Sequence, residues 1–255
     1  MKDYNYSRFA KYYDIVELRA LKSYGNINNF LDKLFKKNKV KSVLDITCGT
    51  GAQVISLAKK GYDVTASDLC KEMLDIAKEK AKKNKLNIRF HQGDIRTAKY
   101  GKFDAVIAIF NSIGHLNKKD FEKAIRTVSN NLKEEGLFIF DIFNLDFMKS
   151  GGFRHHEYID IAMEHKGKKY VRFNKNKIDF KKGIIKINQQ VCIQEGFDKP
   201  IKFKEDWDYQ IYSSDELKKL LEKNGFKVLE FFDHKIKKFD KKKSVSIYTV
   251  ARKIK

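Results

Sequence analysis

The stretch Val43-Leu44-Asp45-Ile46-Thr47-Cys48-Gly49-Thr50-Gly51 decides the fold. Residues 40–46 are a short, mostly apolar run of the β type, and the glycines end it. Helical spacing follows over residues 52–60, and Gly61 provides a stop. A strand that passes through a glycine turn into a helix predicts an open α/β sheet, whose ligands bind at the carboxyl ends of the strands.

The same alternation continues on both sides of this stretch. Helical spacing predicts helices over residues 24–37, 70–83 and 119–132, and apolar runs predict strands over residues 62–67, 87–91, 103–110 and 137–143. Gly136 is expected to end the unit before the last of these strands. Repeated strand–helix–strand units indicate a parallel sheet with right-handed crossovers.

The pattern changes after residue 150. Short β-type runs with turn signals at Asn174, residues 182–183 and Gly196 predict an antiparallel insertion. A capping-box spacing of Ser213 and Glu216 opens a further helix, and two last strands follow over residues 227–232 and 244–251. We therefore expect three segments: a ligand-binding α/β part over 1–150, an inserted β subdomain that covers the site over 151–212, and the rest of the α/β part, with the last helix and two strands, over 213–255.

Composition narrows the classes of protein. The chain has 255 residues, three cysteines without a C-x-x-C pair, no long apolar stretch and no apolar segment near residue 1. These features favour a cytoplasmic protein with no membrane span and no signal peptide. The formal net charge is +21. Two interpretations stay open, lysines on solvated helix faces or an anion-binding face with weak, non-specific nucleic-acid affinity.

Three acidic residues mark the ends of three successive predicted strands. Asp45 precedes the glycines, Asp68 ends the second strand and can accept both hydroxyls of a ribose, and Asp94 ends the third and can accept from an adenine amine. Each alone is also compatible with a turn or an N-cap. A dinucleotide fingerprint would need a third glycine where Val54 stands. An acid before the glycines suits an ammonium rather than a pyrophosphate, which favours S-adenosyl-L-methionine over NAD.

These motifs resemble those of class I S-adenosylmethionine-dependent methyltransferases. The similar stretches are residues 43–53, Asp68, residues 93–95, 103–116 and 134–139. The resemblance implies a doubly wound, Rossmann-like, seven-stranded, mostly parallel sheet whose last strand is antiparallel. Residues 103–116 and 141–146 are further similar to glycine/sarcosine N-methyltransferases and to aminosugar N-methyltransferases. Phe143 stands where the glycine enzymes carry a carboxylate-binding arginine, so a less anionic or larger acceptor is expected.

The resemblance also implies the site. In the glycine enzymes an asparagine that matches Asn111 touches the substrate. His115 is a candidate acceptor contact or base, the alternative being an ordinary loop histidine, and Tyr13 or Tyr12 can lie over the sulfonium or simply pack. We expect Asn111, His115 and Tyr13 to be catalytic. The expected cofactor-binding residues are Tyr13, Arg19, Asp45, Gly49, Thr50, Gly51, Asp68, Leu69, Met73, Asp94, Ile95 and Phe110.

The sequence thus predicts a methyltransferase for a small-molecule acceptor, with nitrogen as the target atom. No metal site is expected, because His155-His156 has no third ligand at a helpful spacing. An RNA or protein methyltransferase and a non-catalytic nucleotide-binding protein stay as alternatives, and so does a homo-oligomer. In the insertion, Trp207, Tyr209, Arg154 and Arg172 are expected to wall an acceptor pocket.

Overall fold

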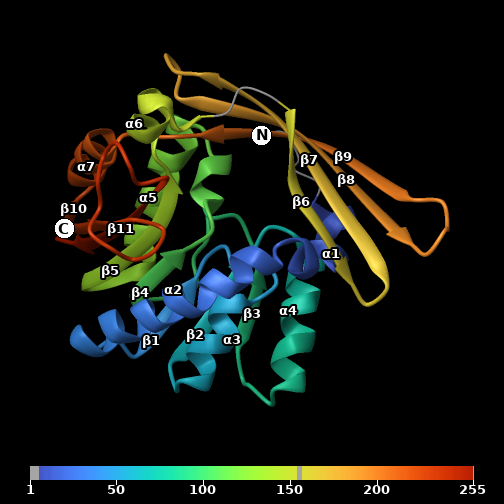
Figure 1. Ribbon diagram of the computed structural model, residues 1–255. Coiled ribbons are helices and arrows are strands. Elements are labelled where there is room, and N and C mark those ends of the chain that lie inside the picture. Colours follow the sequence, from blue (N-terminus) through green and yellow to red (C-terminus); the bar gives the residue numbers. More distant parts are fainter. Residues whose placement is uncertain (1–5, 154–156, 255) are drawn as a thin grey trace.

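The computed structural model describes residues 6–153 and 157–254, without the side chains of residue 8 and of residues 18–25. Its α/β body is a seven-stranded sheet in the order β10-β11-β5-β4-β1-β2-β3 (Figure 1). A separate four-stranded antiparallel sheet has the order β6-β7-β8-β9. The predicted fold class is thereby confirmed, with an inserted antiparallel β subdomain.

The elements of the first half follow the predicted alternation. They are α1 (Tyr6–Val16), α2 (Leu18–Lys37), β1 (Ser42–Asp45), α3 (Ala52–Lys59), β2 (Asp63–Asp68), α4 (Lys71–Lys83), β3 (Arg89–Gln92), β4 (Phe103–Ala108), the short helix η1 (Ser112–His115) and α5 (Lys118–Asn131). The helix predicted from residue 24 begins six residues earlier, at Leu18.

The second half contains the insertion and the last strands of the body. Its elements are β5 (Leu132–Phe143), α6 (Leu145–Phe147), η2 (Met148–Gly152), β6 (Glu157–His165), β7 (Lys168–Asp179), β8 (Ile184–Glu195), β9 (Ile201–Gln210), α7 (Ser214–Lys223), β10 (Phe226–Phe232) and β11 (Ser246–Lys253). The capping box of Ser213 and Glu216 is present at the start of α7.

Two local predictions are wrong. Gly136 does not separate α5 from the next strand: β5 already begins at Leu132, and its pairing with β4 shifts register beyond Phe103. Asn174 is not a turn but lies inside β7, opposite Gln189 of β8. The turn between β6 and β7 is instead made by Lys166 and Gly167, both with positive φ.

Alternating side chains of the central strands bury the two faces of the large sheet. Val43 packs with α2 and α3 on one face, and Leu44 packs with α5 and α7 on the other. This period of two is the geometry of a strand that is covered on both faces. The antiparallel strand is β11, which lies between β5 and β10.

The strand order reverses next to β1. From β1 the chain moves outward through β2 to β3, and then returns to β4 on the other side of β1. Helix connections therefore diverge at the carboxyl ends of β1 and β4, where open sheets of this kind bind ligands.

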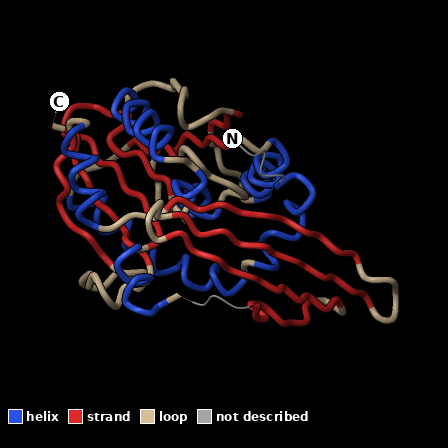
Figure 2. The backbone as a smooth tube through the Cα atoms, turned by 90° about the horizontal axis from the view of Figure 1, so that it is seen from above, coloured by secondary structure: helices blue, strands red, loops and turns tan. Residues whose placement is uncertain are grey.

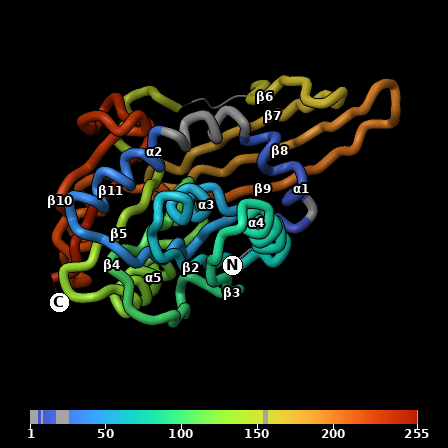
Figure 3. The backbone as a smooth tube through the Cα atoms, turned by 90° about the horizontal axis from the view of Figure 1, so that it is seen from below, coloured from blue at the N-terminus to red at the C-terminus, as the bar shows by residue number. Residues whose placement is uncertain are grey.

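The second sheet extends beyond the helices of the body, as Figure 2 shows. Helix α1 lies between α4 and this sheet (Figures 1 and 3). Phe9 and Val16 of α1 pack with Tyr170, Val191 and Ile193 of the sheet in one apolar cluster. The insertion and α1 together therefore form a cover over the carboxyl edge of the large sheet. No helix within the described parts of the chain is long and apolar enough to cross a membrane.

Candidate active site

A cavity of about 470 Å³ opens at the carboxyl ends of β1, β2, β3 and β4. Among the residues predicted from the sequence, its walls contain Tyr13, Gly49, Thr50, Asp68, Leu69, Met73, Asp94, Ile95, Phe110 and His115. Asp45, Gly51 and Asn111 lie nearby in the fold but outside this lining. The side chain of Arg19 falls outside the described residues, so its predicted contact with the cofactor stays a prediction.

Gly49 and Gly51, the two glycines of the turn after β1, differ in what surrounds them. Both have positive φ, +52° at Gly49 and +88° at Gly51, a region that side chains other than glycine's rarely adopt. A Cβ on Gly51 would approach the Cβ of Ala77 to 3.0 Å, so Gly51 allows the turn to pack against α4. A Cβ on Gly49 would meet nothing within 4 Å. Gly49 is thus the glycine that leaves room for a ligand.

Asp68 is held at the end of β2 by backbone donors. One carboxylate oxygen accepts from the amide of Gly49 at 2.7 Å, and the other accepts from the amide of Cys70 at 2.9 Å. Burial raises the pKa of Asp68. A carboxylate oxygen has two acceptor sites, so each oxygen can take one further donor. This geometry fits the two hydroxyls of a ribose.

Asp45 is 2% exposed and lies outside the cavity lining, directly before the lining residues Ile46 and Thr47 in the sequence. Its carboxyl accepts from the amide of Thr47 at 3.3 Å. Burial, with Asp68 nearby, raises the pKa of Asp45 to about 8. A cation in this part of the cavity would lower that pKa. Asp45 is therefore suited to an ammonium group such as the one in the methionine part of S-adenosylmethionine.

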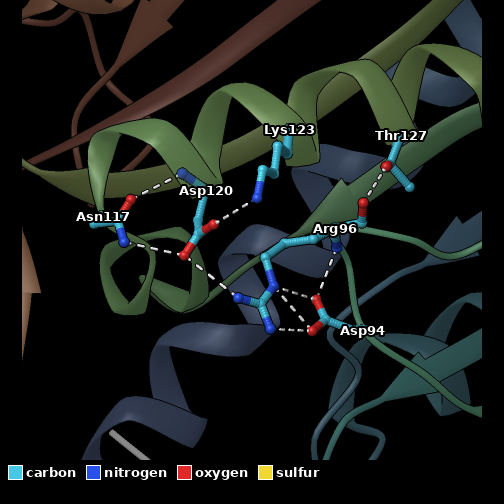
Figure 4. A network of polar contacts seen from close by, with 6 residues as sticks. All are labelled: Asp94, Arg96, Asn117, Asp120, Lys123 and Thr127. Carbon is cyan, nitrogen blue, oxygen red and sulfur yellow. Dashed lines mark hydrogen bonds and ion pairs between the residues drawn. The ribbon is translucent and has the colours of Figure 1, made fainter. Parts of the chain in front are cut away.

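Asp94 lines the cavity, but its carboxylate already has a partner (Figure 4). Both oxygens accept from Arg96, whose Nε lies 2.9 Å from each of them. Arg96 also reaches Asp120 at 3.3 Å, and Asp120 in turn accepts from Asn117. The guanidinium lowers the pKa of Asp94. An adenine amine at Asp94 would have to share a carboxylate that is occupied by Arg96, so that predicted contact stays a prediction.

An aromatic group surrounds His115 at another part of the cavity wall. The hydroxyl of Tyr6 lies 3.0 Å from His115 Nε2. The rings of Trp207 and Tyr209 have centroids 5.6 Å and 4.7 Å from that of the imidazole. Burial lowers the pKa of His115 to about 4, so the imidazole is neutral near pH 7. A neutral imidazole can accept a proton.

The contribution of Tyr6 was not predicted from the sequence. Tyr6 and Tyr13 both line the cavity. They are seven residues apart, which is two turns of a helix, so both rings lie on one side of α1. That spacing was a signal which could have identified Tyr6. Burial raises the pKa of Tyr6 well above its ordinary value, so its hydroxyl keeps its proton.

Asn111, which follows β4, is hydrogen-bonded to the end of β5. Its backbone amide donates to Asp141 at 3.1 Å, and its side-chain oxygen accepts from the amide of Phe143 at 3.2 Å. A Cβ on Gly114 would approach the Asn111 amide to 2.7 Å. In this structure Asn111 therefore positions η1, which carries His115. Its predicted contact with substrate stays a prediction.

The residues predicted in the insertion have two different roles. Trp207 lies against Tyr6, with ring centroids 4.9 Å apart, and so borders the group around His115. Arg172 is bound by Glu17 and, at 2.6 Å, by Asp160. The guanidinium thus ties the second sheet to the end of α1, rather than walling a pocket as predicted. Arg154 and the pair His155-His156 lie outside the described residues.

The described residues contain no group of three or more His, Cys, Asp or Glu that could hold a metal ion. Cys48, Cys70 and Cys192 are free thiols. The residues that line the cavity thus fit a nucleoside with a polar tail, through Asp68 and the open turn at Gly49, with Asp45 buried outside the lining.

Comparison with known proteins agrees with this geometry. Residues 43–136 match a family model described as a methyltransferase domain. The chain is 37% identical over 128 residues to a glycine/sarcosine N-methyltransferase of Parasynechococcus marenigrum, covering 49% of this chain and 45% of that protein. It is 28% identical over 134 residues to dTDP-3-amino-3,4,6-trideoxy-alpha-D-glucopyranose N,N-dimethyltransferase of Streptomyces venezuelae, covering 51% and 55%. The alignments thus span about half the length of these curated relatives.

A solved structure matches over nearly the whole chain. It is an S-adenosylmethionine-dependent methyltransferase from Clostridium acetobutylicum, with a TM-score of 0.81, 25% identity and coverage of 97% of this chain and 98% of that one. Residues 43–136 are therefore similar to methyltransferase domains, and the fold is that of the S-adenosylmethionine-dependent methyltransferases. The resemblance identified from the sequence motifs is confirmed.

Proposed function

We propose that the protein transfers a methyl group from S-adenosyl-L-methionine to a nitrogen atom of a small-molecule amine. The observation that carries the proposal is that one cavity is lined both by Asp68, with two free acceptor sites, and by the neutral imidazole of His115. The first feature suits the cofactor and the second suits an acceptor that loses a proton.

The chain's residues have separate tasks in this proposal. Asp68 binds the ribose, Asp45 faces the ammonium, and Tyr13 of α1 closes the cavity from above. The bound cofactor supplies an activated methyl group. Positioning and exclusion of water are therefore the main contributions of the protein.

The acceptor nitrogen attacks in its neutral form. His115 Nε2 lies 3.0 Å from Tyr6 Oη. When the acceptor displaces that contact, the neutral imidazole can accept a hydrogen bond from the acceptor N–H and so orient the nitrogen toward the methyl group. Its pKa of about 4 is too low for it to keep the proton, which passes on to water after transfer. Tyr6, which keeps its proton, then orients the imidazole or the acceptor.

The acceptor side of the cavity favours an amine without a carboxylate. Phe143 stands near Tyr209, with ring centroids 6.0 Å apart, and offers no positive charge. Arg172 is already bound by two carboxylates. Of the two curated relatives, one is named for glycine and sarcosine and the other for an amino sugar. The apolar surroundings of His115 support an acceptor of the second kind.

The net charge of +21 keeps RNA as a second candidate acceptor. Several of the lysines have carboxylate partners one helical turn away, such as Lys71 with Asp75 and Lys83 with Glu79. Such pairs are typical of solvated helix faces, and they favour the small-molecule acceptor. The three cysteines are free thiols, which is typical of proteins in the reducing cytoplasm, so we propose that the protein acts there.

A methyl-transfer screen tests the proposal. The purified protein is incubated with labelled S-adenosylmethionine and separate pools of small amines, amino acids and bulk tRNA. We expect label in the small-amine pool and none in tRNA. The His115→Gln variant should lower transfer to the amine at least tenfold while binding of S-adenosylhomocysteine stays within threefold. Transfer to tRNA alone would overturn the small-molecule proposal.

A further inference from the structure

One polar side chain in the wall of the cavity has a donor without a partner. Gln53, the second residue of α3, lines the cavity and is 6% exposed. Its side-chain nitrogen is buried and has no hydrogen-bond partner among the residues that the structure describes. A buried donor that stays unpaired costs free energy, and for that reason most buried polar groups are paired. Gln53 therefore indicates a ligand that accepts a hydrogen bond.

Backbone donors lie beside Gln53 at the start of α3. The N-cap of this helix is Gly51, which has no side chain to accept from the first amides. Ala52, the first residue of α3, lines the cavity together with Gln53. Within residues 6–153 and 157–254, the amides of these two residues donate to no backbone carbonyl. The first amides of a helix form its positive end, so the start of α3 presents donors that suit an anion.

The cation next to this turn already has an acidic partner. Lys80 of α4 donates to the carbonyl oxygen of Thr50 at 2.9 Å and pairs with Asp14 of α1 at 2.5 Å. An anion at the start of α3 therefore depends on neutral donors. Such donors still bind an anion well, because a hydrogen bond to an ionised acceptor is about twice as strong as one between neutral groups.

The turn also orders the parts of the ligand along the chain. Gly49 donates to Asp68, the carboxylate that fits a ribose, and α3 begins three residues after Gly49. Three residues span at most about 11 Å. The start of α3 is thus within reach of the amino-acid tail of a nucleoside whose ribose lies at Asp68. In S-adenosylmethionine that tail has a carboxylate.

We propose that Gln53 recognises the carboxylate of the cofactor's amino-acid tail, and that the first amides of α3 complete this subsite. This inference rests on the cofactor of the proposed function. The terminal amide of glutamine rotates between two broad minima, so its NH₂ group can turn to the carboxylate while α3 keeps its place. Neutral donors then select a ligand with a carboxylate, while Asp45 and Asp68 serve the ammonium and the ribose.

The test compares two nucleosides that differ in the carboxylate, S-adenosylhomocysteine and its decarboxylated analogue, which keeps the amine. The variants are Gln53→Met, which keeps the length of the side chain without its donor, and Gln53→Glu, which places a negative charge there. The matched control is Gln190, which is exposed on β8 and receives the same two replacements. Calorimetry gives Kd for both nucleosides, and thermal unfolding without ligand shows that each variant folds.

We expect the parent to bind S-adenosylhomocysteine at least tenfold more tightly than the analogue. Gln53→Met should weaken S-adenosylhomocysteine about tenfold, the loss of one hydrogen bond to a charged acceptor, and should leave the analogue within twofold. Gln53→Glu should weaken S-adenosylhomocysteine about 100-fold, because two carboxylates then face each other, and should leave the cationic analogue bound at least as tightly. The Gln190 variants should change neither Kd.

Thermal unfolding separates ligand binding from a role in folding. Gln53→Met removes an unpaired buried donor, so the ligand-free variant should unfold at the temperature of the parent or above it. A lower unfolding temperature together with equal losses for both nucleosides would overturn the inference. An unchanged Kd for S-adenosylhomocysteine in both folded Gln53 variants would overturn it as well.

These measurements need no methyl acceptor, which separates the inference from the proposed function. A parent that shows the expected binding pattern but transfers no methyl group in the amine screen would refute the transfer proposal and support the role of Gln53. A parent that binds both nucleosides equally, or neither, would overturn the role of Gln53 whatever the outcome of that screen.

Discussion

Replacing Asp68 by asparagine should weaken cofactor binding about 100-fold. The carboxylate uses one acceptor site on each oxygen for the amides of Gly49 and Cys70, at 2.7 and 2.9 Å. The two remaining sites are the ones available to a ribose. Each hydrogen bond to a charged acceptor contributes about 1.5–3 kcal/mol. The NH₂ group of asparagine cannot accept from one of the two hydroxyls, and loss of that bond at the upper value costs about 3 kcal/mol, which is a factor of about 100 in Kd.

Asparagine is a better replacement than alanine for this purpose. It keeps the side-chain volume and still offers one oxygen to a backbone donor, while its NH₂ group faces the other donor and cannot accept. The matched control is Asp75→Asn on α4, which removes the same charge from a side chain that is 48% exposed and paired with Lys71. We expect that control to leave Kd within twofold, because the pair is solvated.

The assay is titration calorimetry with S-adenosylhomocysteine and with its 2′-deoxy analogue. In the parent, the missing hydroxyl should weaken binding at least tenfold. In Asp68→Asn the same analogue should cost much less, because the partner of that hydroxyl has been removed. A Kd within threefold of the parent in a folded Asp68→Asn variant would refute the assignment of Asp68 to the ribose.

Three further predictions concern ionisable groups. First, the pKa of Asp45 is about 8 before a cation binds, so binding of S-adenosylhomocysteine at pH 7 should release close to one proton. Asp45→Asn should abolish that release. Calorimetry in buffers of different ionisation enthalpy measures it. Second, His115 has a pKa of about 4 in the fold against 6.5 unfolded, so its contribution to stability is complete above pH 6.5 and is lost as the pH falls toward 4. In urea unfolding, His115→Gln should remove on the order of 3 kcal/mol of the fall in unfolding free energy over that range. An unchanged fall would contradict the burial of a neutral imidazole. Third, Asp14 on α1 accepts from Thr50 at 2.6 Å and pairs with Lys80 at 2.5 Å, and both the carboxylate and the ammonium are about one-third exposed. In stopped flow, Asp14→Asn should speed dissociation of S-adenosylhomocysteine about threefold. An unchanged rate would mean that this pair does not hold α1.

The cofactor half of the site was predictable because its parts are local in the sequence. The strand, the turn at Gly49 and the following helix form one continuous segment, and Asp68 stands at the end of the next strand along the chain. Parallel strands bring their carboxyl ends to one edge, so the spacing alone predicts that these groups meet. The different role of Gly51, which lies against Ala77, needed the packing of two helices to be known.

Partners that come from distant segments were not predictable in the same way. Arg172 is a residue type that often binds substrates. Only the ion pair with Glu17, at the end of α1, shows that its guanidinium already has a carboxylate partner. Asp94 is a strand-end acid like Asp68, yet Arg96 occupies it (Figure 4). Residue type and strand position are the same for both acids, and the difference lies in neighbouring side chains.

The acceptor half depends on the register between strands, which periodicity does not encode. Asn174 suggests a turn in the sequence, because asparagine adopts turn conformations readily. Its place opposite Gln189 follows from the lengths of β7 and β8, which are joined by a turn at Gly183. A shift of one residue would move Asn174 and Asn176 to the outer face of the sheet and bring Lys175 or Lys177 inward. The chemistry offered to the acceptor is therefore a property of the paired strands, and a single strand's composition does not predict it.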